Sequence, residues 1–358
     1  MQVATYKLKH ALDLLEPAVA RKATLPITQN VLFQEGALQA TNLEMFISVD
    51  LPEVAGPAFT LPYRMLVQTL KHVPGGMTAD IQWDKGVAII RVGNDTLRLT
   101  GLEAPEFPPL PIMLGDGELV DGDQFTQALL AAVPYCAPAK DTSRPVLNCV
   151  CVTLGDTITL AGADGFQLAW QEVPLKLTGA GCGLKEMLVH RNHVAALDHT
   201  WKRAIKPPST GVEGTGFKEV ASAPSLNLAR LAIAKRMMRV RMTQGRASFQ
   251  FGEATVHAYL VQGEFPNYRM LIPADPPRKV IFEAGAALRA LQMSTPVAAE
   301  GSNIIRLRWE GELMHMSAHG AEVGEVSSAI PVGVRGEPGH IAFNATYLGE
   351  YLEGKNGL

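Results

Sequence analysis

The chain has 358 residues, of which 47% are hydrophobic and 19% are charged, and its formal net charge is −3 at pH 7. This length suits two or three domains of roughly 100–200 residues, and the apolar content supplies their cores, which excludes a disordered chain. The sequence has no run of 18 uncharged apolar residues and no signal-peptide core, so we expect a cytoplasmic protein. Four cysteines without a CxxC pair argue against a disulfide scaffold and against structural zinc.

A three-fold internal repeat organises the sequence. Each copy opens with a short β-prone run that leads into an amphipathic helix. In the first copy Leu8, Leu12 and Leu15 recur at i, i+4 and i+7, which places one apolar stripe against a sheet. These first helices are expected over 8–15, 125–133 and 287–293.

Two further features recur in the same order in each copy. A strand, a polar turn and a returning strand end at a proline, which stops the strand. The prolines are Pro52, Pro174 and Pro331. A second helix then follows, expected over 61–70, 189–197 and 343–352, with Pro62 in the first turn of its helix. The repeat therefore predicts three α+β units in series, with helices on mainly antiparallel sheets.

Proline-rich stretches at 105–114 and 273–277 mark the boundaries of these units. We therefore predict domains over 1–112, 113–275 and 276–358. The middle domain carries a basic insertion at about 204–237, with a short basic amphipathic helix expected over 226–236. Ten basic and three acidic residues lie between Asp198 and Arg246, so this segment can attract a polyanion, unless it is simply a solvated basic loop.

Catalytic motifs are absent from the sequence. It has no GxxxxGK[ST] phosphate loop, GxGxxG fingerprint, HExxH or GxSxG. Histidines lie close together at His190, His193 and His199, and again at His315 and His319, but no third ligand completes either set. Cys149 and Cys151 lie two residues apart on a predicted strand, so they face the same side and suit buried packing. We expect no catalytic residues, no metal and no cofactor; a metal-dependent hydrolase that uses His190 and His193 is the enzyme alternative.

Seven short motifs in chain order resemble one known family. They are TLPI at 24–27 with Asn30, ATNLEM at 40–45, EFP at 106–108, SRPVLN at 143–148, ADGFQLA at 163–169, GEFPNY at 263–268 and FNATYL at 343–348. Together they resemble the bacterial DNA polymerase III beta subunit, the beta sliding clamp family. The resemblance implies three tandem clamp-type domains, with helices that line an inner face and antiparallel sheets outside. The third repeat is expected to be shortened at its C-terminus and to lack the usual last strands.

The resemblance also implies a function. A homodimeric ring would encircle duplex DNA without reading its sequence and would tether the replicative polymerase, as a processivity factor without catalysis of its own. Its partners would be duplex DNA, a second copy of the chain, the replicative polymerase and the clamp loader, with no membrane. The alternative is a diverged or truncated clamp homologue that acts as a monomeric adaptor without ring closure.

Site residues follow from the matching positions. The DNA-binding residues implied are Lys22, Lys71, Arg144 and Arg191, with Lys7, Lys9 and Lys202 on the same helices. The pocket for partner peptides, between the second and third domains, is implied to consist of Leu147, Ala163, Gly165, Phe166, Gln167, Leu168, Pro266, Met270 and Leu271. Phe107 and Val297 are implied at the dimer interface. The chain has Phe166-Gln167 where the family usually has His-Arg, and Met270 where it has a basic residue, so we expect a more apolar pocket.

Overall fold

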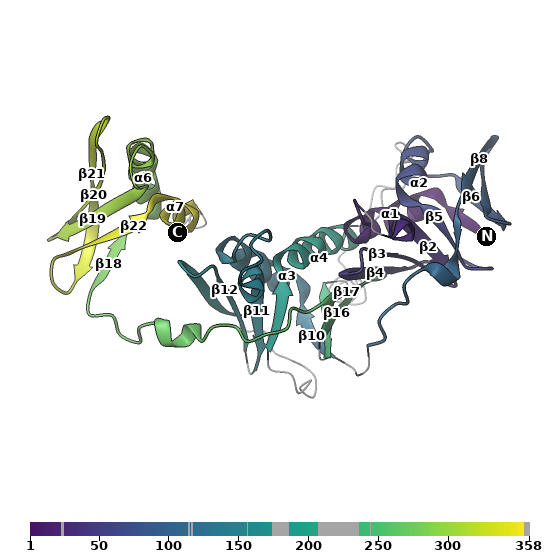
Figure 1. Cartoon of the computed structure of the whole chain (residues 1–358), viewed down its shortest axis with the longest axis horizontal. Helices are drawn as coiled ribbons and strands as arrows, with labels where there is room; N and C mark the ends of the chain where they lie inside the picture. The colour runs from purple at the N-terminus through teal and green to yellow at the C-terminus, as the bar shows by residue number, and fades with distance from the viewer. Residues whose placement is uncertain are drawn as a thin grey trace, which may run out of the picture. The chain divides into compact units, whose positions relative to one another are not determined.

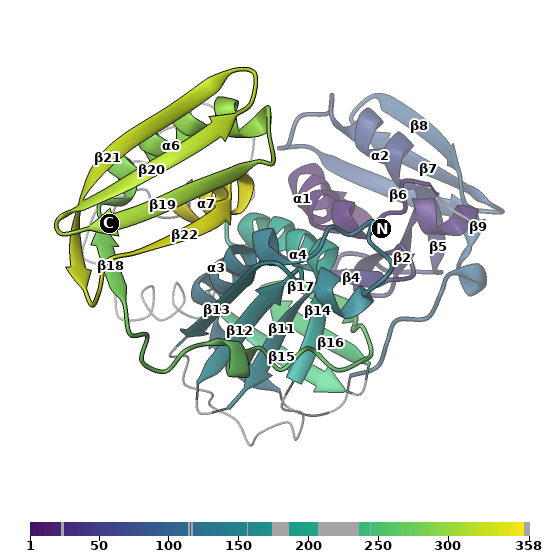
Figure 2. The same cartoon turned by 60° about the vertical axis from the view of Figure 1, so that its left-hand side comes forward.

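The computed structural model describes residues 1–22, 25–113, 115, 117–155, 157–173, 186–206, 236–243 and 245–353. These residues form two compact units, Met1–Phe265 and Pro266–Leu358 (Figures 1 and 2). Residues 207–235 of the predicted basic insertion, with all but the last residue of its expected helix, lie outside the described residues.

The described residues of the first unit form seventeen strands and four α-helices. Its strands are β1 (Gln2–Ala4), β2 (Asn30–Gln34), β3 (Ala37–Thr41), β4 (Met45–Asp50), β5 (Phe59–Pro62), β6 (Thr78–Asp84), β7 (Val87–Val92), β8 (Asp95–Thr100), β9 (Leu102–Glu103), β10 (Glu118–Asp121), β11 (Cys149–Leu154), β12 (Ile158–Ala163), β13 (Leu168–Val173), β14 (Glu186–His190), β15 (Met237–Thr243), β16 (Arg246–Phe251) and β17 (Ala254–Tyr259). Its helices are α1 (Thr5–Leu15), α2 (Tyr63–Leu70), α3 (Gly122–Ala132) and α4 (Arg191–Ala204), with the 3₁₀ turns η1 (Glu16–Ala18), η2 (Pro26–Gln29), η3 (Ala104–Glu106), η4 (Val133–Tyr135) and η5 (Pro145–Asn148).

The second unit has one sheet and two helices among its described residues. Its elements are η6 (Tyr268–Leu271), β18 (Lys279–Phe282), α6 (Ala284–Ala299), β19 (Ile304–Glu310), β20 (Leu313–Gly320), β21 (Gly324–Arg335), β22 (Gly339–Asn344) and α7 (Ala345–Glu353). The sheet has the order β18-β21-β20-β19-β22, and α6 packs across β19, β20 and β21 and against α7.

The order of the strands confirms the predicted repeat. Strands β5-β2-β3-β4, β14-β11-β12-β13 and β22-β19-β20-β21 follow one pattern in the three copies, and β1-β6-β7-β8 matches β10-β15-β16-β17. The predicted α+β fold of three tandem copies is therefore confirmed. In the third copy β18 pairs with β21, whereas β1 and β10 pair with the strands that follow the second helix of their copies.

One strand pair joins the first two copies. Strand β17 pairs antiparallel with β4, from Ala254 opposite Val49 to Ala258 opposite Met45, which produces a nine-stranded sheet. A single apolar core accordingly runs through both copies. The predicted boundary near residue 112 therefore lies within one compact unit, and the second unit begins at Pro266, ahead of the predicted boundary at 275.

The helices begin where the local sequence permits. Leu8, Leu12 and Leu15 of α1 are all buried, as their spacing predicts. Asp121 caps α3 by accepting a hydrogen bond from the backbone N–H of Gln124 at 2.9 Å. Pro62 was expected inside the first turn of α2, but its extended ψ of 113° makes it the N-cap, because β5 continues up to that residue. Among the described residues, no helix combines the length and the apolar character needed to cross a bilayer.

The start of α3 packs closely against α4 of the same copy at Gly122. A Cβ added at Gly122 would lie 2.1 Å from Cη2 of Trp201 on α4. The Trp201 ring is buried, and its Nε1–H donates to Asp123 Oδ1 at 2.9 Å, so the ring cannot shift without losing this bond.

Gly122→Ala should therefore lower the free energy of unfolding by about 1–3 kcal/mol, because the added methyl group overpacks the α3–α4 contact. Urea unfolding followed by tryptophan fluorescence would measure the change. Gly155→Ala is the control, because its added Cβ meets only the Thr157 carbonyl oxygen at 3.6 Å. Equal stability of the two variants would contradict the packing argument.

Candidate nucleic-acid interface and partner-binding surfaces

Four of the seven predicted DNA-binding cations lie on helices α1 and α4 of the first unit, and α1 packs against both α2 and α4 (Figure 1). Lys7 and Lys9 lie on α1, Lys71 follows α2, Lys22 follows η1, Arg144 precedes η5, Arg191 begins α4 and Lys202 lies in its last turn.

Four of these seven side chains are engaged within the chain. Lys7 pairs with Glu53, Lys9 donates to the Val73 carbonyl, and Lys202 pairs with Asp198 at 2.7 Å. The hydrogen bond from Lys7 to the Glu53 carboxylate raises the pKa of the lysine, so its charge is firmly present. Arg191 donates to the carbonyls of Cys136 and Ala137, both at 2.9 Å. Arg191 therefore holds the chain after η4 in place.

The other three predicted cations are more open. Lys22 and Lys71 are exposed and make no hydrogen bond or ion pair to any described residue. Arg144 is exposed and donates to the Asp164 carbonyl at 3.3 Å, which holds its guanidinium against Gly165. The structure thus joins a predicted DNA-binding residue to the turn that carries the predicted partner pocket.

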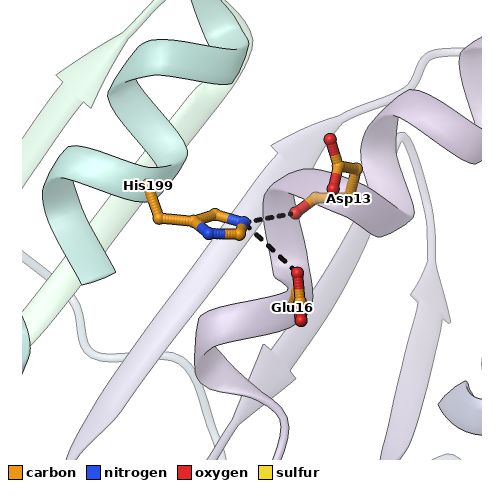
Figure 3. A group of neighbouring side chains, drawn as sticks. All are labelled: Asp13, Glu16 and His199. Atoms are coloured by element: carbon orange, nitrogen blue, oxygen red, sulfur yellow. Dashed lines mark hydrogen bonds and ion pairs between the residues drawn. The ribbon is translucent and has the colours of Figure 1, made fainter. Parts of the chain in front are cut away.

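A polar cluster ties α1 to α4 across the boundary between the first two copies (Figure 3). His199 Nε2 lies 3.2 Å from the backbone oxygen of Asp13 and 3.5 Å from Glu16 Oε2. Arg203 Nε donates to Asp13 Oδ2 at 2.7 Å. Burial and the nearby Glu16 carboxylate raise the pKa of Tyr63, which keeps this phenol protonated. The cluster therefore links the two helices through hydrogen bonds and ion pairs.

Asp13, Glu16 and His199 also form the one group of possible metal ligands among the described residues, with donor atoms within 4.8 Å of one another. An imidazole and two carboxylates are a ligand set that transition metals accept. However, Arg203 already neutralises Asp13, and His199 Nε2 must carry its proton to donate to the Asp13 carbonyl. These side chains therefore satisfy one another through hydrogen bonds and an ion pair without a metal ion. No sequence pattern predicts this network, because Asp13 and His199 are 186 residues apart.

The histidine pair of the enzyme alternative does not assemble a catalytic site. The rings of His190 and His193 lie 5.6 Å apart in an edge-on arrangement, and no third described ligand completes a metal group there. His193 is buried, and neither of its ring nitrogens has a hydrogen-bond partner. Desolvation, assisted by His190, lowers the pKa of His193 to about 4. The carboxylate of Glu44, at 3.9 Å, is largely solvated and does not reverse this shift. His193 is thus a neutral core residue at pH 7.

Six of the predicted pocket residues lie in the first unit, around the turn between β12 and β13. The Asp164 carboxylate accepts hydrogen bonds from the backbone N–H groups of Phe166 and Gln167 at 2.8 and 2.9 Å, and Gly165 has a φ of +96°. This rigid turn leaves the Phe166 ring 81% exposed. Leu147 is buried, and Ala163 and Leu168 are half-buried.

The three remaining pocket residues lie at the start of the second unit. Pro266, Met270 and Leu271 are all exposed, and the exposed fraction of Met270 is 82%. Exposed apolar side chains grouped in this way are typical of surfaces that bind a partner. The pocket between the two units stays a prediction.

The two residues predicted at the dimer interface, Phe107 and Val297, lie in different units. Phe107 is only 7% exposed and packs with Ile27 and Leu32 in a small cluster of its own chain. Val297 is half-buried against the core of the second unit. Met293, on the same helix as Val297, is 64% exposed and is the better probe of an interface there. Cys149 and Cys151 are buried, as expected for packing, and Cys136 is buried as well.

Known proteins resemble this chain along nearly its whole length. Residues 269–354 match the family model for the DNA polymerase III beta subunit, C-terminal domain. The chain is 25% identical over 362 residues to the beta sliding clamp of Synechococcus elongatus, covering 98% of this chain and 88% of that protein. It is 26% identical over 351 residues to the beta sliding clamp of Pseudomonas putida, covering 95% and 86%.

Solved structures show the same fold. The DNA polymerase III subunit beta of Pseudomonas aeruginosa superposes with a TM-score of 0.80 at 22% identity, over 99% of this chain and 89% of that one. The sliding clamp of Bacillus subtilis superposes with a TM-score of 0.79 at 18% identity, over 98% and 89%. The family resemblance that the sequence motifs indicated is confirmed.

His193 makes stability depend on pH. Because its folded pKa of about 4 lies below the unfolded value of 6.5, the unfolded chain binds the proton first. The stabilisation is present above pH 6.5 and is lost as the pH falls towards 4. Urea unfolding at pH 7.5 and pH 5.0 should show a loss that is about 2 kcal/mol smaller in His193→Gln than in the parent. As a control, the exposed His72→Gln should lose as much free energy of unfolding between pH 7.5 and pH 5.0 as the parent does. If His193→Gln also loses as much as the parent, His193 is not the source of the pH dependence.

Proposed function

We infer that this member of the bacterial beta sliding clamp family is a processivity factor that encircles duplex DNA and tethers the replicative polymerase of the DNA polymerase III system. One observation carries the inference: the similarity to beta sliding clamps is continuous over 98% of the chain. It favours the sliding clamp over a monomeric adaptor. The protein is an accessory subunit without catalysis of its own, and it acts on DNA in the cytoplasm.

Ring closure supplies the topology that this function needs. Three domains, over 1–112, 113–275 and 276–358, are repeated in a second copy of the chain, and the two copies join head to tail around the duplex. The strand order that recurs in the copies supports three similar domains per chain. A clamp loader opens the ring, and partner proteins bind the pocket that includes Phe166 and Met270. The departures from the family's basic residues at these positions make the pocket more apolar.

Sliding requires attraction to phosphates without readout of base edges. A lysine held by an ion pair offers a phosphate less than one whose ammonium has no protein partner, because the ion pair must first be broken or shared. Lys22 and Lys71 have no such partner among the described residues, whereas Lys7 and Lys202 do. We therefore assign the strongest phosphate contacts to Lys22, Lys71 and the exposed Arg144, and secondary contacts to Lys7, Lys9, Arg191 and Lys202.

The double variant Lys22→Glu with Lys71→Glu should bind a short duplex about tenfold more weakly at moderate salt. Each lost phosphate contact removes about 0.9 from the slope of log affinity against log salt, so the slope should fall by about 2. Fluorescence anisotropy with labelled duplex at several salt concentrations measures both quantities.

The matched control reverses the same charge elsewhere. Lys85, in the turn between β6 and β7, and Arg306, on β19, are both exposed. Lys85→Glu with Arg306→Glu should leave the salt slope within error of the parent's. An unchanged salt slope in the Lys22 and Lys71 double variant would contradict the assignment of phosphate contacts to these two lysines. An equal loss of DNA affinity in both double variants would contradict it as well.

The dimer is tested at α6 of the second unit. The parent should sediment with twice the chain mass of 38.5 kDa. Met293→Asp should shift this mass to that of one chain, because a carboxylate would be buried without a partner in the interface. Ile341→Asp on β22 is the control, since Ile341 is 44% exposed on the strand at the opposite end of the sheet from β18. A parent of one chain mass, or a Met293→Asp variant that stays dimeric, would exclude this interface.

A further inference from the structure

A groove of about 620 Å³ opens at the junction between the first two copies, inside the first unit. Three segments line it: the turn between β3 and β4, the linker that precedes β10, and the facing ends of β16 and β17. Its lining includes Leu43, Phe46, Pro108, Ile112, Arg246 and Tyr259. This volume lies in the range of pockets that bind specific ligands. We call it the first-junction groove.

The apolar wall of the groove is formed in advance. Leu43 has a φ of +76°, which a leucine rarely adopts. Asn42 fixes this turn, because its side-chain oxygen accepts hydrogen bonds from the backbone N–H groups of Glu44 and Met45 at 3.0 and 2.8 Å. On the opposite side, prolines stiffen the linker and leave Ile112 81% exposed. A ligand that binds here meets ordered apolar groups and loses little free energy in arranging them.

A single cation stands in the lining of the groove. The Arg246 guanidinium lies over the Tyr259 ring at 5.1 Å, and Nη2 is 3.4 Å from the phenol oxygen. Among the described residues, no carboxylate lies within 4.0 Å of Arg246, in contrast to Arg203, which Asp13 neutralises. The charge of the groove is therefore complementary to a carboxylate that the described chain does not supply.

The groove also has a counterpart within the chain. Asn42 and Asp164 make the same pair of turn hydrogen bonds, followed by Leu43 and Gly165, which both have a positive φ. Aligning the two turns makes Phe46 equivalent to Leu168 in the repeat. Aligning the two EFP motifs makes Pro108 equivalent to Pro266, and Ile112 equivalent to Met270. The first-junction groove thus repeats positions of the predicted partner pocket, with Arg246 added.

We propose that the first-junction groove binds an extended peptide of a partner protein, in which an aliphatic or aromatic side chain stands beside a carboxylate. The apolar side chain packs between Leu43, Phe46 and Ile112. The carboxylate pairs with the Arg246 guanidinium, and the peptide backbone runs along the proline-rich linker. This binding surface is separate from the predicted partner pocket and stands whether or not the chain forms a ring.

The test selects displayed random heptapeptides on the full-length chain and measures the affinity of the best binders by fluorescence anisotropy. Selected peptides should combine an apolar residue with an acidic one. Ile112→Asp and Arg246→Glu should each weaken binding about tenfold or more, since each removes a buried contact or a charged hydrogen bond. Ile112 is exposed, so its replacement leaves the fold intact; circular dichroism checks both variants.

Two controls make the result specific. Arg98→Glu reverses an exposed arginine outside the groove and should leave binding unchanged. A selected peptide with lysine in place of its acidic residue should bind Arg246→Glu better than the parent, which a merely structural effect cannot produce.

Three outcomes would overturn the proposal. One is selection of no peptide. Another is binding that is lost in Met270→Asp but kept in Ile112→Asp, which would assign the peptides to the predicted partner pocket and leave the sliding-clamp function untouched. The last is a change of oligomeric mass in Ile112→Asp, which would identify a second copy of this chain as the occupant.

Discussion

The pairing of β4 with β17 is the contact on which the first unit depends. Its hydrogen bonds join strands that lie about 200 residues apart in the sequence and make one nine-stranded sheet from two copies of the repeat. Because a sheet edge presents unpaired N–H and C=O groups, mutual pairing satisfies both copies at once. The sheet in turn fixes α1 beside α4 and places the linker that carries Ile112 over the ends of β16 and β17.

The charged side chains of the first unit fall into two groups, those that hold the structure together and those that have no protein partner. Arg203 and His199 hold α1 and α4 together through Asp13 and Glu16, and Arg191 holds backbone carbonyls, so these groups contribute to structure. Lysines without a protein partner are the ones that suit mobile contacts with phosphate, because their ammonium groups exchange one phosphate for the next without breaking an ion pair. A sliding protein needs both kinds, with rigid joints between domains and cations that are free to contact phosphate.

The repeat also relates the first-junction groove to the residues of the predicted partner pocket. The same turn hydrogen bonds and the same EFP motif recur in the first two copies, so several residues predicted to bind partner peptides have counterparts at the first-junction groove. Differences between the copies then decide what each surface binds. Arg246 and the positive-φ Leu43 distinguish the first junction, whereas the exposed Phe166 and Met270 distinguish the residues predicted for the second.

The sequence by itself determined the repeat, the α+β fold, the buried leucine stripe of α1 and the resemblance to beta sliding clamps, because periodicity and short motifs are properties of neighbouring residues. Tertiary structure alone decided which strand joins the copies, that Phe107 is buried in its own chain, that Arg191 binds carbonyls, and that Asp13 meets His199 and Arg203. These facts depend on residues far apart in the sequence, whose distance in space is set by sheet pairing and packing and leaves no local pattern to detect.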